Sequence, residues 1–308
     1  MLDWETFLIT LYDLVDTFCK RLPPKRPRPG PEASLSVSEV ITLLVLSQWG
    51  HFTSERAFYR WAQRHLQSAF PTLPDRSQFN RLARQHQGQV EAFFVFTTTW
   101  ARETPSLFEI LDGYGAKVRN LNRRGSGWLD LFANKGHCSR LGWYYGFCIL
   151  DAVTPEGYLR GFGFGPASTN DMTLAETFLA LRQRPDPRLV TVGTPSQGVY
   201  LTDRGFNGYD TQMRWVMDYQ ASIVCPPRAC DPHTWPKGLH HLLASLRQIV
   251  ETVHEKMLHT FRLESERAHT LGGFGVRLAA RASLHNVCIW LNRQLGRPGL
   301  TFADLIAW

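Results

Sequence analysis

The sequence has few of the features that mark a membrane or secreted protein. No apolar run approaches the length of a membrane span. The first residues, Met1-Leu-Asp-Trp-Glu5, have neither the basic start nor the small-residue cleavage site of a signal peptide. Only six of the 308 residues are cysteines, and their positions show no disulfide rhythm, so we expect reduced thiols. These absences predict a cytoplasmic protein without a membrane partner.

Three side chains of the kind that bind zinc come close together in the sequence at Cys225, Cys230 and His233. Their spacing is loose, and Pro226-Pro227 lies between them. No second pair of ligands completes the four that a structural zinc ion takes. The sequence therefore does not decide whether these three residues bind metal.

Lysine is also scarce, with 6 residues against 28 arginines, while the formal net charge is +7. A positive balance favours a polyanionic partner, either nucleic acid or an anionic membrane. The arginine guanidinium group can donate two parallel hydrogen bonds to phosphate oxygens or to the edge of a guanine base, which favours DNA. A high-GC genome also produces arginine-rich proteins, so composition alone does not choose between these explanations.

The length of the chain, together with its 44% of hydrophobic residues, predicts about two domains. No internal repeat or low-complexity tract is visible. We place the boundary near Glu103-Thr-Pro105. Residues 1–104 form a helical region for DNA binding or dimerisation with a proline-rich connector at 22–33, and residues 105–308 form the second domain.

The first region reads as a series of helices. Residues 2–20 carry an apolar stripe, and Ser36 and Glu39 have the spacing of a capping box that opens an apolar helix. Further helices are expected over 54–66 and from Asp75, whose side chain can cap the last one. That helix has a basic face of Arg76, Arg81 and Arg84. Three short helices with a basic last member resemble a helix-turn-helix module, although dimer contacts are an alternative role.

The second domain alternates strand and helix patterns, which predicts an α/β fold with a mixed sheet flanked by helices. Thr154-Pro-Glu-Gly157 predicts a turn between two hairpin strands. Asn170 or Asp171 is expected to cap one helix and Asn207 another. The expected strands are 106–111, 144–153, 158–164, 199–202 and 221–225.

Two aspartates follow predicted strands and precede glycines. Asp112 ends the strand 106–111 and comes before Gly113, and Asp203 ends the strand 199–202 and comes before Arg204-Gly205. Aspartate is depleted in strands, so this placement suggests carboxylates presented at one edge of a sheet. Aspartate and glycine are also ordinary turn residues, and each position taken alone fits a turn.

A third acidic position lies on the helix predicted over 245–261. Residues at three- and four-residue spacing, including Val250, Val253 and Met257, form an apolar stripe that should face a core. Arg247, Glu251, Glu255 and Leu258 form the other side. Glu251 and Glu255 are a like-charge pair that costs a few tenths of a kcal/mol unless a positive charge lies nearby. Arg247 or a metal ion would supply that charge.

The order Asp112, Asp203, Glu251 resembles the acidic triad of the DDE transposases of bacterial insertion sequences. Several segments resemble, in order, those of the 982 family of insertion sequences and its relatives. The chain departs from that pattern at Cys148, at Asn170-Asp171 and at Leu258, where a lysine is expected in some relatives. The similar segments are Ile110-Leu-Asp-Gly113, Asn134-Lys-Gly136, Trp143-Tyr-Tyr-Gly-Phe147, Gly165-Pro-Ala-Ser-Thr-Asn-Asp171, Leu201-Thr-Asp-Arg-Gly-Phe206, Arg247-Gln-Ile-Val-Glu-Thr-Val253 and Glu266-Arg-Ala-His-Thr-Leu-Gly-Gly-Phe274.

This resemblance implies a ribonuclease-H-like catalytic core in residues 105–308. Asp112 would bridge two Mg²⁺ ions, Asp203 would hold one and Glu251 the other, with Mn²⁺ as a substitute. The resemblance also implies that the protein binds transposon terminal inverted repeats and target DNA as a homodimer or higher oligomer. The alternatives are a ribonuclease-H-like endonuclease and a transposase-derived DNA-binding protein without catalysis. The expected DNA-binding residues are Arg76, Arg81, Arg84, Arg119, Arg123, Arg124 and Arg247.

Overall fold

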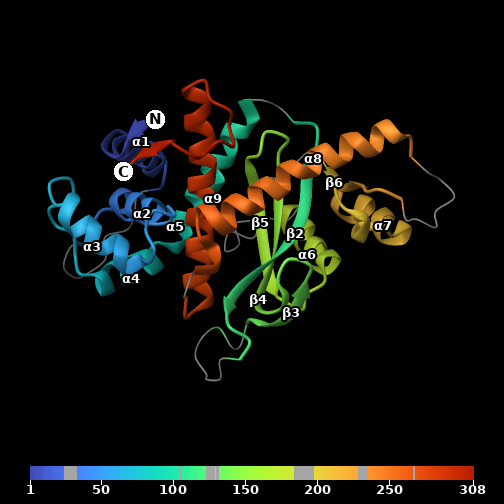
Figure 1. The fold of residues 1–308 in the computed structure, drawn as a ribbon, viewed down its shortest axis with the longest axis horizontal. Helices are drawn as coiled ribbons and strands as arrows, with labels where there is room; N and C mark the ends of the chain where they lie inside the picture. The colour runs from blue at the N-terminus through green and yellow to red at the C-terminus, as the bar shows by residue number, and fades with distance from the viewer. Residues whose placement is uncertain are drawn as a thin grey trace.

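The computed structural model describes residues 1–23, 33–103, 106–122, 129, 132–183, 198–227, 235–265 and 268–308. These residues form an α/β fold in which helices flank a six-stranded mixed sheet. Figure 1 shows the N-terminal helices on one side of the molecule and the sheet on the other, with the long helix α9 (Leu271–Gln294) standing between them. No helix in the described part of the chain combines the length and apolar character that a membrane crossing requires.

The N-terminal region is helical, as the sequence predicts. Ser36 and Glu39 form the expected capping box, since the Ser36 amide donates to Glu39 Oε2 at 2.6 Å and the Glu39 amide to Ser36 Oγ at 3.2 Å. Asp75 Oδ1 accepts from the amides of Ser77 and Gln78, which confirms its role as a cap. The helices are α1 (Trp4–Cys19), α2 (Val37–Leu46), α3 (Glu55–His65), α4 (Arg76–Gln85), α5 (Gln87–Thr98) and the 3₁₀ turn Thr99–Glu103.

The sheet has β2 at its centre. Strand β4 runs antiparallel to β2, and β3 and β5 pair with successive parts of β4 along its other edge. On the opposite side of β2, β6 runs parallel to it and β7 parallel to β6. The strands are β2 (Glu109–Arg119), β3 (Asn134–Cys138), β4 (Gly142–Val153), β5 (Leu159–Pro166), β6 (Val199–Leu201) and β7 (Ser222–Val224).

Local signals in the second region produce the expected connections. The Gly157 amide donates to the Thr154 carbonyl at 2.8 Å, and Gly157 has φ +90, which closes the hairpin between β4 and β5. Asn170 Oδ1 accepts from the Met172 amide at 2.8 Å at the start of α6 (Asp171–Gln183). Both the turn and the Asn170 cap are therefore confirmed.

Each face of the sheet has its own core because strand side chains alternate. Leu111, Leu150 and Ala152 pack with α6 and α7 (Tyr209–Tyr219) on one face. Ile110, Ile149 and other residues of the second face join the main core, to which α5, α8 (Lys237–Glu255) and α9 contribute. Figure 1 shows α8 crossing the sheet obliquely. This second face is the one that carries the predicted acids.

The C-terminal residues return to the N-terminal helices. Helix α9 contacts α5 and α2, and the short strand β8 (Ile306–Ala307) pairs in parallel with β1 (Leu2–Asp3). Figure 1 accordingly shows the two termini close together. The main core includes residues of both regions. The packing therefore shows no break near residue 104, and the domain boundary there stays a prediction.

Three local expectations are wrong. Asp112 does not end its strand, because β2 continues through Gly113 to Arg119 in antiparallel pairing with β4. Asn207 does not cap α7: Gly208 is the N-cap residue, and the Asn207 side chain donates to the Pro226 carbonyl at 3.4 Å. Leu258 is buried, not solvent-facing.

The burial of Leu258 follows from a change of helix type. Helix α8 passes into a π-helical turn at Lys256–Thr260, where the Phe261 amide donates to the Lys256 carbonyl at 2.9 Å. The wider i→i+5 turn rotates the following side chains relative to an α-helix. A 3.6-residue period therefore misplaces Leu258, although Met257 is buried as predicted.

Candidate active site

Asp112 lies on β2, and Asp203 lies two residues beyond the end of β6, the parallel neighbour of β2. Ile110 on β2 is the register partner of Leu201, the last residue of β6. The backbone at Asp203 is still extended, so Asp112 and Asp203, each two residues further along the chain, come to about the same level. Ile110 and Leu201 both belong to the main core, and residues two apart share a face. Both carboxyl groups are therefore on the sheet face that α8 crosses. The structure brings together two of the three acids predicted from the sequence.

The charges around Asp112 oppose one another. The pKa of Asp112 is raised to about 7, mainly by burial, while Arg247 on α8 acts to lower it and the negative charges of Asp203 and Asp171 act to raise it. The Gly113 amide donates to Asp112 Oδ1 at 3.0 Å. Asp203 Oδ1 accepts from the Gly205 amide at 2.8 Å, so Asp203 also caps the short turn Arg204–Phe206. A cation between the two carboxylates would offset both the burial and their repulsion.

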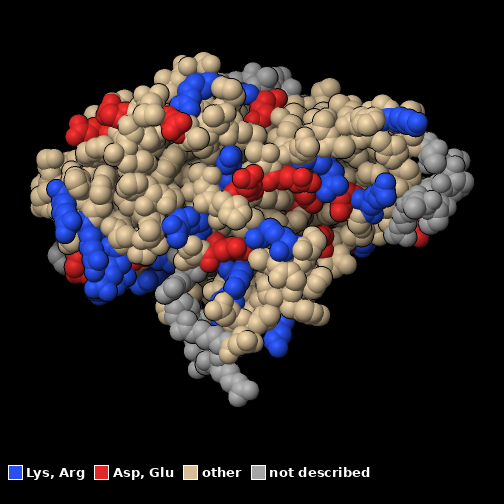
Figure 2. Space-filling model, viewed as in Figure 1, with Lys and Arg blue, Asp and Glu red and all other residues tan. Residues whose placement is uncertain are grey.

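Helix α8 carries the remaining predicted residues. Arg247 is half-buried, and its Nε is buried without a hydrogen-bond partner. Glu251 and Glu255 are exposed, and Figure 2 shows acidic side chains gathered where α8 crosses the sheet. Within the described ranges, no three His, Cys, Asp or Glu side chains lie close enough to hold a metal ion. Glu251 therefore does not complete a three-ligand group with Asp112 and Asp203 in this structure.

A buried polar cluster beside Asp112 escaped the sequence reasoning. Asp151 on β4 is the direct register partner of Asp112 and is 1% exposed. His254 Nε2 on α8 lies 3.7 Å from Asp151 Oδ2, and the His254 ring stacks on Tyr114 with centroids 4.1 Å apart. Burial raises the pKa of Asp151 to about 8 and lowers the pKa of His254 to about 3. An aspartate inside the apolar stretch 147–153 of β4 was the signal that could have found it.

The opposite face of β2 approaches helix α6 closely at Gly113. A Cβ atom at Gly113 would lie 2.8 Å from Asp171 Oδ1. Cys148 Sγ on β4 lies 3.1 Å from the same oxygen. Glycine at position 113 lets the first turn of α6 lie against the strand next to Asp112.

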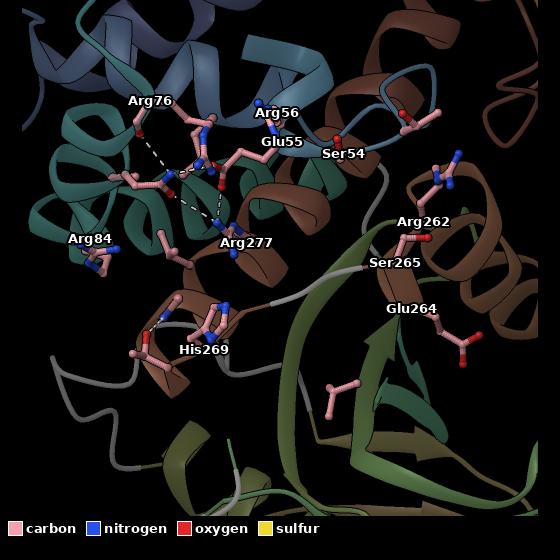
Figure 3. Close-up of a pocket in the computed structure, with 18 of the residues that line it drawn as sticks. Ser54, Glu55, Arg56, Arg76, Arg84, Arg262, Glu264, Ser265, His269 and Arg277 are labelled. Carbon is pink, nitrogen blue, oxygen red and sulfur yellow. Dashed lines mark hydrogen bonds and ion pairs between the residues drawn. The ribbon is translucent and has the colours of Figure 1, made fainter. Parts of the chain in front are cut away.

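A second feature is a basic groove of about 1190 Å³ between the N-terminal helices and the sheet. Its lining comes from α3, α4, the end of β2, the 3₁₀ turn Leu263–Ser265 and α9, and it includes eight arginine or lysine side chains against two glutamates. Figure 3 shows labelled arginines from the N-terminal helices and from the C-terminal part of the chain around the same space. The groove contains four of the predicted DNA-binding residues: Arg76, Arg81, Arg84 and Arg119.

These four arginines differ in their surroundings. Arg81 and Arg84 are exposed on α4, and Figure 2 shows basic side chains gathered over α3 and α4. Arg76 forms an ion pair with Glu55, in which Arg76 Nη1 lies 3.0 Å from Glu55 Oε1. The Arg119 guanidinium lies 3.9 Å from the centre of the Tyr145 ring.

Several predicted residues fall outside the described ranges. These are Arg123 and Arg124, Cys230 and His233 of the zinc hypothesis, and positions 24–32 of the proline-rich connector.

No family model, curated protein or solved structure matches this chain. The geometry of the acids and of the groove therefore carries the functional argument by itself.

Proposed function

We propose that this chain is a DDE transposase that binds the ends of an insertion sequence, cleaves phosphodiester bonds and joins the freed 3′-hydroxyl to target DNA. The observation that carries the proposal is the placement of Asp112 on β2 beside Asp203, which directly follows the adjacent parallel strand β6, under the helix that bears Arg247 and Glu251. The strand order supports a ribonuclease-H-like core, because the four antiparallel strands β2–β5 are followed by helix, parallel strand, helix and parallel strand.

The paired aspartates fit Mg²⁺. They are hard oxygen donors, and Mg²⁺ is commonly held by one or two carboxylates, several waters and substrate phosphates. When bound, the metal lowers the pKa of the attacking water and neutralises charge on the leaving oxygen. The predicted second ion would need Glu251 closer to the pair than it lies in this structure. The two-ion arrangement is therefore a proposal that depends on movement of α8 when DNA binds.

The other residues would bind and orient the phosphate. Arg247 is the positive group that acts on Asp112, and its buried Nε has no hydrogen-bond partner within the described chain. An unpaired buried donor is costly, and a phosphate oxygen is an acceptor that would satisfy it. Arg247 is thus suited to hold the scissile phosphate against the two aspartates.

The test uses a donor plasmid that carries the gene with its natural flanking DNA, a target plasmid and Mg²⁺. Joined product from the wild-type chain, lost in Asp112→Asn and Asp203→Asn variants that still bind DNA, supports the proposal. Cleavage without joining would instead identify an endonuclease. Binding without cleavage would identify a DNA-binding protein derived from a transposase.

A further inference from the structure

The basic groove brings together residues far apart in the sequence. Arg81 and Arg84 come from α4, and Lys117 and Arg119 come from the far end of β2, the strand that also carries Asp112. Arg262 adds a further cation and has φ 53, a left-handed conformation that a non-glycine residue adopts only at a cost. The groove is therefore a joint feature of the helical region and the sheet.

The two glutamates of the groove are already neutralised. Glu55 accepts from Arg76 Nη1 at 3.0 Å and from Asn80 Nδ2 at 2.6 Å, and it also pairs with Arg277 of α9. Figure 3 shows this contact joining the helical region to α9. Glu264 accepts from Arg140 Nη2 at 2.6 Å. These ion pairs leave the groove with a large excess of positive charge.

We propose that the groove is one binding site for the phosphate backbone of duplex DNA, contacted at the same time by α4 and by the end of β2. The inference rests on the proposed function for the identity of the nucleic acid. A helix-turn-helix module that acted alone would need only α4. Here α4 shares the groove with Lys117 and Arg119, so a duplex held by α4 also contacts the strand that leads to Asp112.

The length of β2 limits the distance between the groove and Asp112. Asp112 and Arg119 are seven residues apart on β2, and strand residues advance about 3.3 Å each, so the span is at most about 23 Å. A DNA strand advances about 3.4 Å per nucleotide, so this span covers about seven base pairs. The groove thus contacts the duplex within about one helical turn of the phosphate at Asp112.

The experiment measures binding of a fluorescent duplex by anisotropy at several salt concentrations without divalent metal, so that cleavage plays no part. Each lost phosphate contact should lower the slope of log affinity against log salt by about 0.9, which weakens affinity about eightfold at 0.1 M salt when the lines meet at 1 M. We expect this loss for Lys117→Ala, and about twice the slope change for Arg81→Ala with Arg84→Ala. Lys20→Ala and Lys237→Ala remove the same charge outside the groove and should change neither quantity.

Several results would overturn the proposal. A Lys117→Ala variant that binds like the two controls, beside a weakened α4 variant, would show that α4 acts alone. An α4 variant that binds normally would remove the site altogether. Duplex RNA of the same sequence bound as tightly as DNA would contradict the assignment to DNA. Absence of cleavage in Mg²⁺ would sink the proposed transposase activity and leave these binding results unaffected.

Discussion

Asp112 on β2 and Asp151 on β4 are direct partners in the antiparallel register, so two carboxyl groups stand side by side on the sheet face that α8 covers. Opposed residues in such a pair have Cβ atoms about 5 Å apart. Asp151 is the more deeply buried of the two, and Tyr114 acts on its carboxyl group to lower the pKa that burial raises. Both the protonation of the pair and the position of α8 therefore matter for the candidate site.

The first prediction concerns stability and pH. Burial raises the pKa of Asp151 to about 8 from the ordinary value of 3.8. The contribution of the protonated Asp151 to folding stability is therefore fully present below about pH 4 and is lost as pH rises towards 8. One proton gives a slope of up to ~1.4 kcal/mol per pH unit. Asp151→Asn stays neutral throughout this window, so its melting temperature should fall less than that of the wild type between pH 4 and 8.

The matched control is Asp210→Asn, which changes an exposed aspartate in the first turn of α7. Its melting temperature should follow the wild-type curve at every pH. Parallel curves for Asp151→Asn and the wild type would mean that Asp151 is ionised in the folded protein.

Local signals in the sequence predicted much of the fold. The Ser36 capping box, the Asp75 cap and the turn at Thr154–Gly157 each depend on residues within four positions of one another, and all three are confirmed. The end of β2 was wrong because its length is decided by pairing with β4, which no local pattern records.

The candidate site was predictable only in part, for the same reason. Asp112 and Asp203 follow apolar runs and could be found from the sequence, whereas Asp151 matters because β4 pairs with β2 in one particular register. Similarly, Arg84 and Arg119 were both predicted to bind DNA, but only tertiary packing places them in one groove. The periodicity of a sequence predicts local structure, but it does not predict which distant residues come into contact when the chain folds.

The second prediction concerns the buried ion pair that fixes the start of β2. Arg182 of α6 is 2% exposed and pairs with Glu109, donating from Nη2 to Oε1 at 3.2 Å and from Nη1 to the Tyr200 hydroxyl at 3.0 Å. These contacts join β2 and β6, the strands that position Asp112 and Asp203. Arg182→Met leaves Glu109 buried with less compensation and should lower the free energy of unfolding by about 3–5 kcal/mol in urea titrations.

Arg214→Met provides the comparison for that variant. Arg214 also pairs with a glutamate, Glu176, at 2.8 Å, but the two side chains are 51% and 31% exposed. Loss of such a surface pair should cost less than about 1 kcal/mol. Equal losses from Arg182→Met and Arg214→Met would show that burial does not set the strength of the inner pair.

The third prediction decides which glutamate of α8 serves the proposed reaction. Both Glu251 and Glu255 are exposed, and the apolar stripe of the helix does not choose between them. The family resemblance and the spacing from Arg247 favour Glu251. Glu251→Gln keeps the shape of the side chain but removes its charge, so cleavage in Mg²⁺ should fall by several orders of magnitude while DNA binding survives.

Glu255→Gln is the matched variant and should keep nearly full cleavage activity. It should also stabilise α8 slightly, because it relieves the repulsion between two glutamates four residues apart. An active Glu251→Gln beside an inactive Glu255→Gln would reverse the assignment. Full activity in both would rule out a glutamate of this helix as a metal ligand.

The last prediction links the groove to the acids through the length of β2. If DNA is held in the groove and cut at Asp112, the two contacts are at most about seven base pairs apart along the duplex. Substrates whose arm on the groove side is shortened stepwise from 20 to 4 base pairs should keep the contacts with the end of β2 until the arm falls below about seven. The cleavage rate should then drop, because the contacts with Lys117 and Arg119 are lost.

Lys117→Ala gives this experiment its internal check. The variant already lacks one groove contact, so its cleavage rate with long arms should be lower and should depend less on arm length than the wild-type rate does. A wild-type rate unchanged down to 4 base pairs would show that the cut duplex does not pass through the groove. A drop at about seven base pairs in the wild type, flattened in Lys117→Ala, would place the groove and Asp112 on one continuous DNA path. A general loss of stability produces no length threshold, and a contact elsewhere on the arm would give one that Lys117→Ala leaves unchanged.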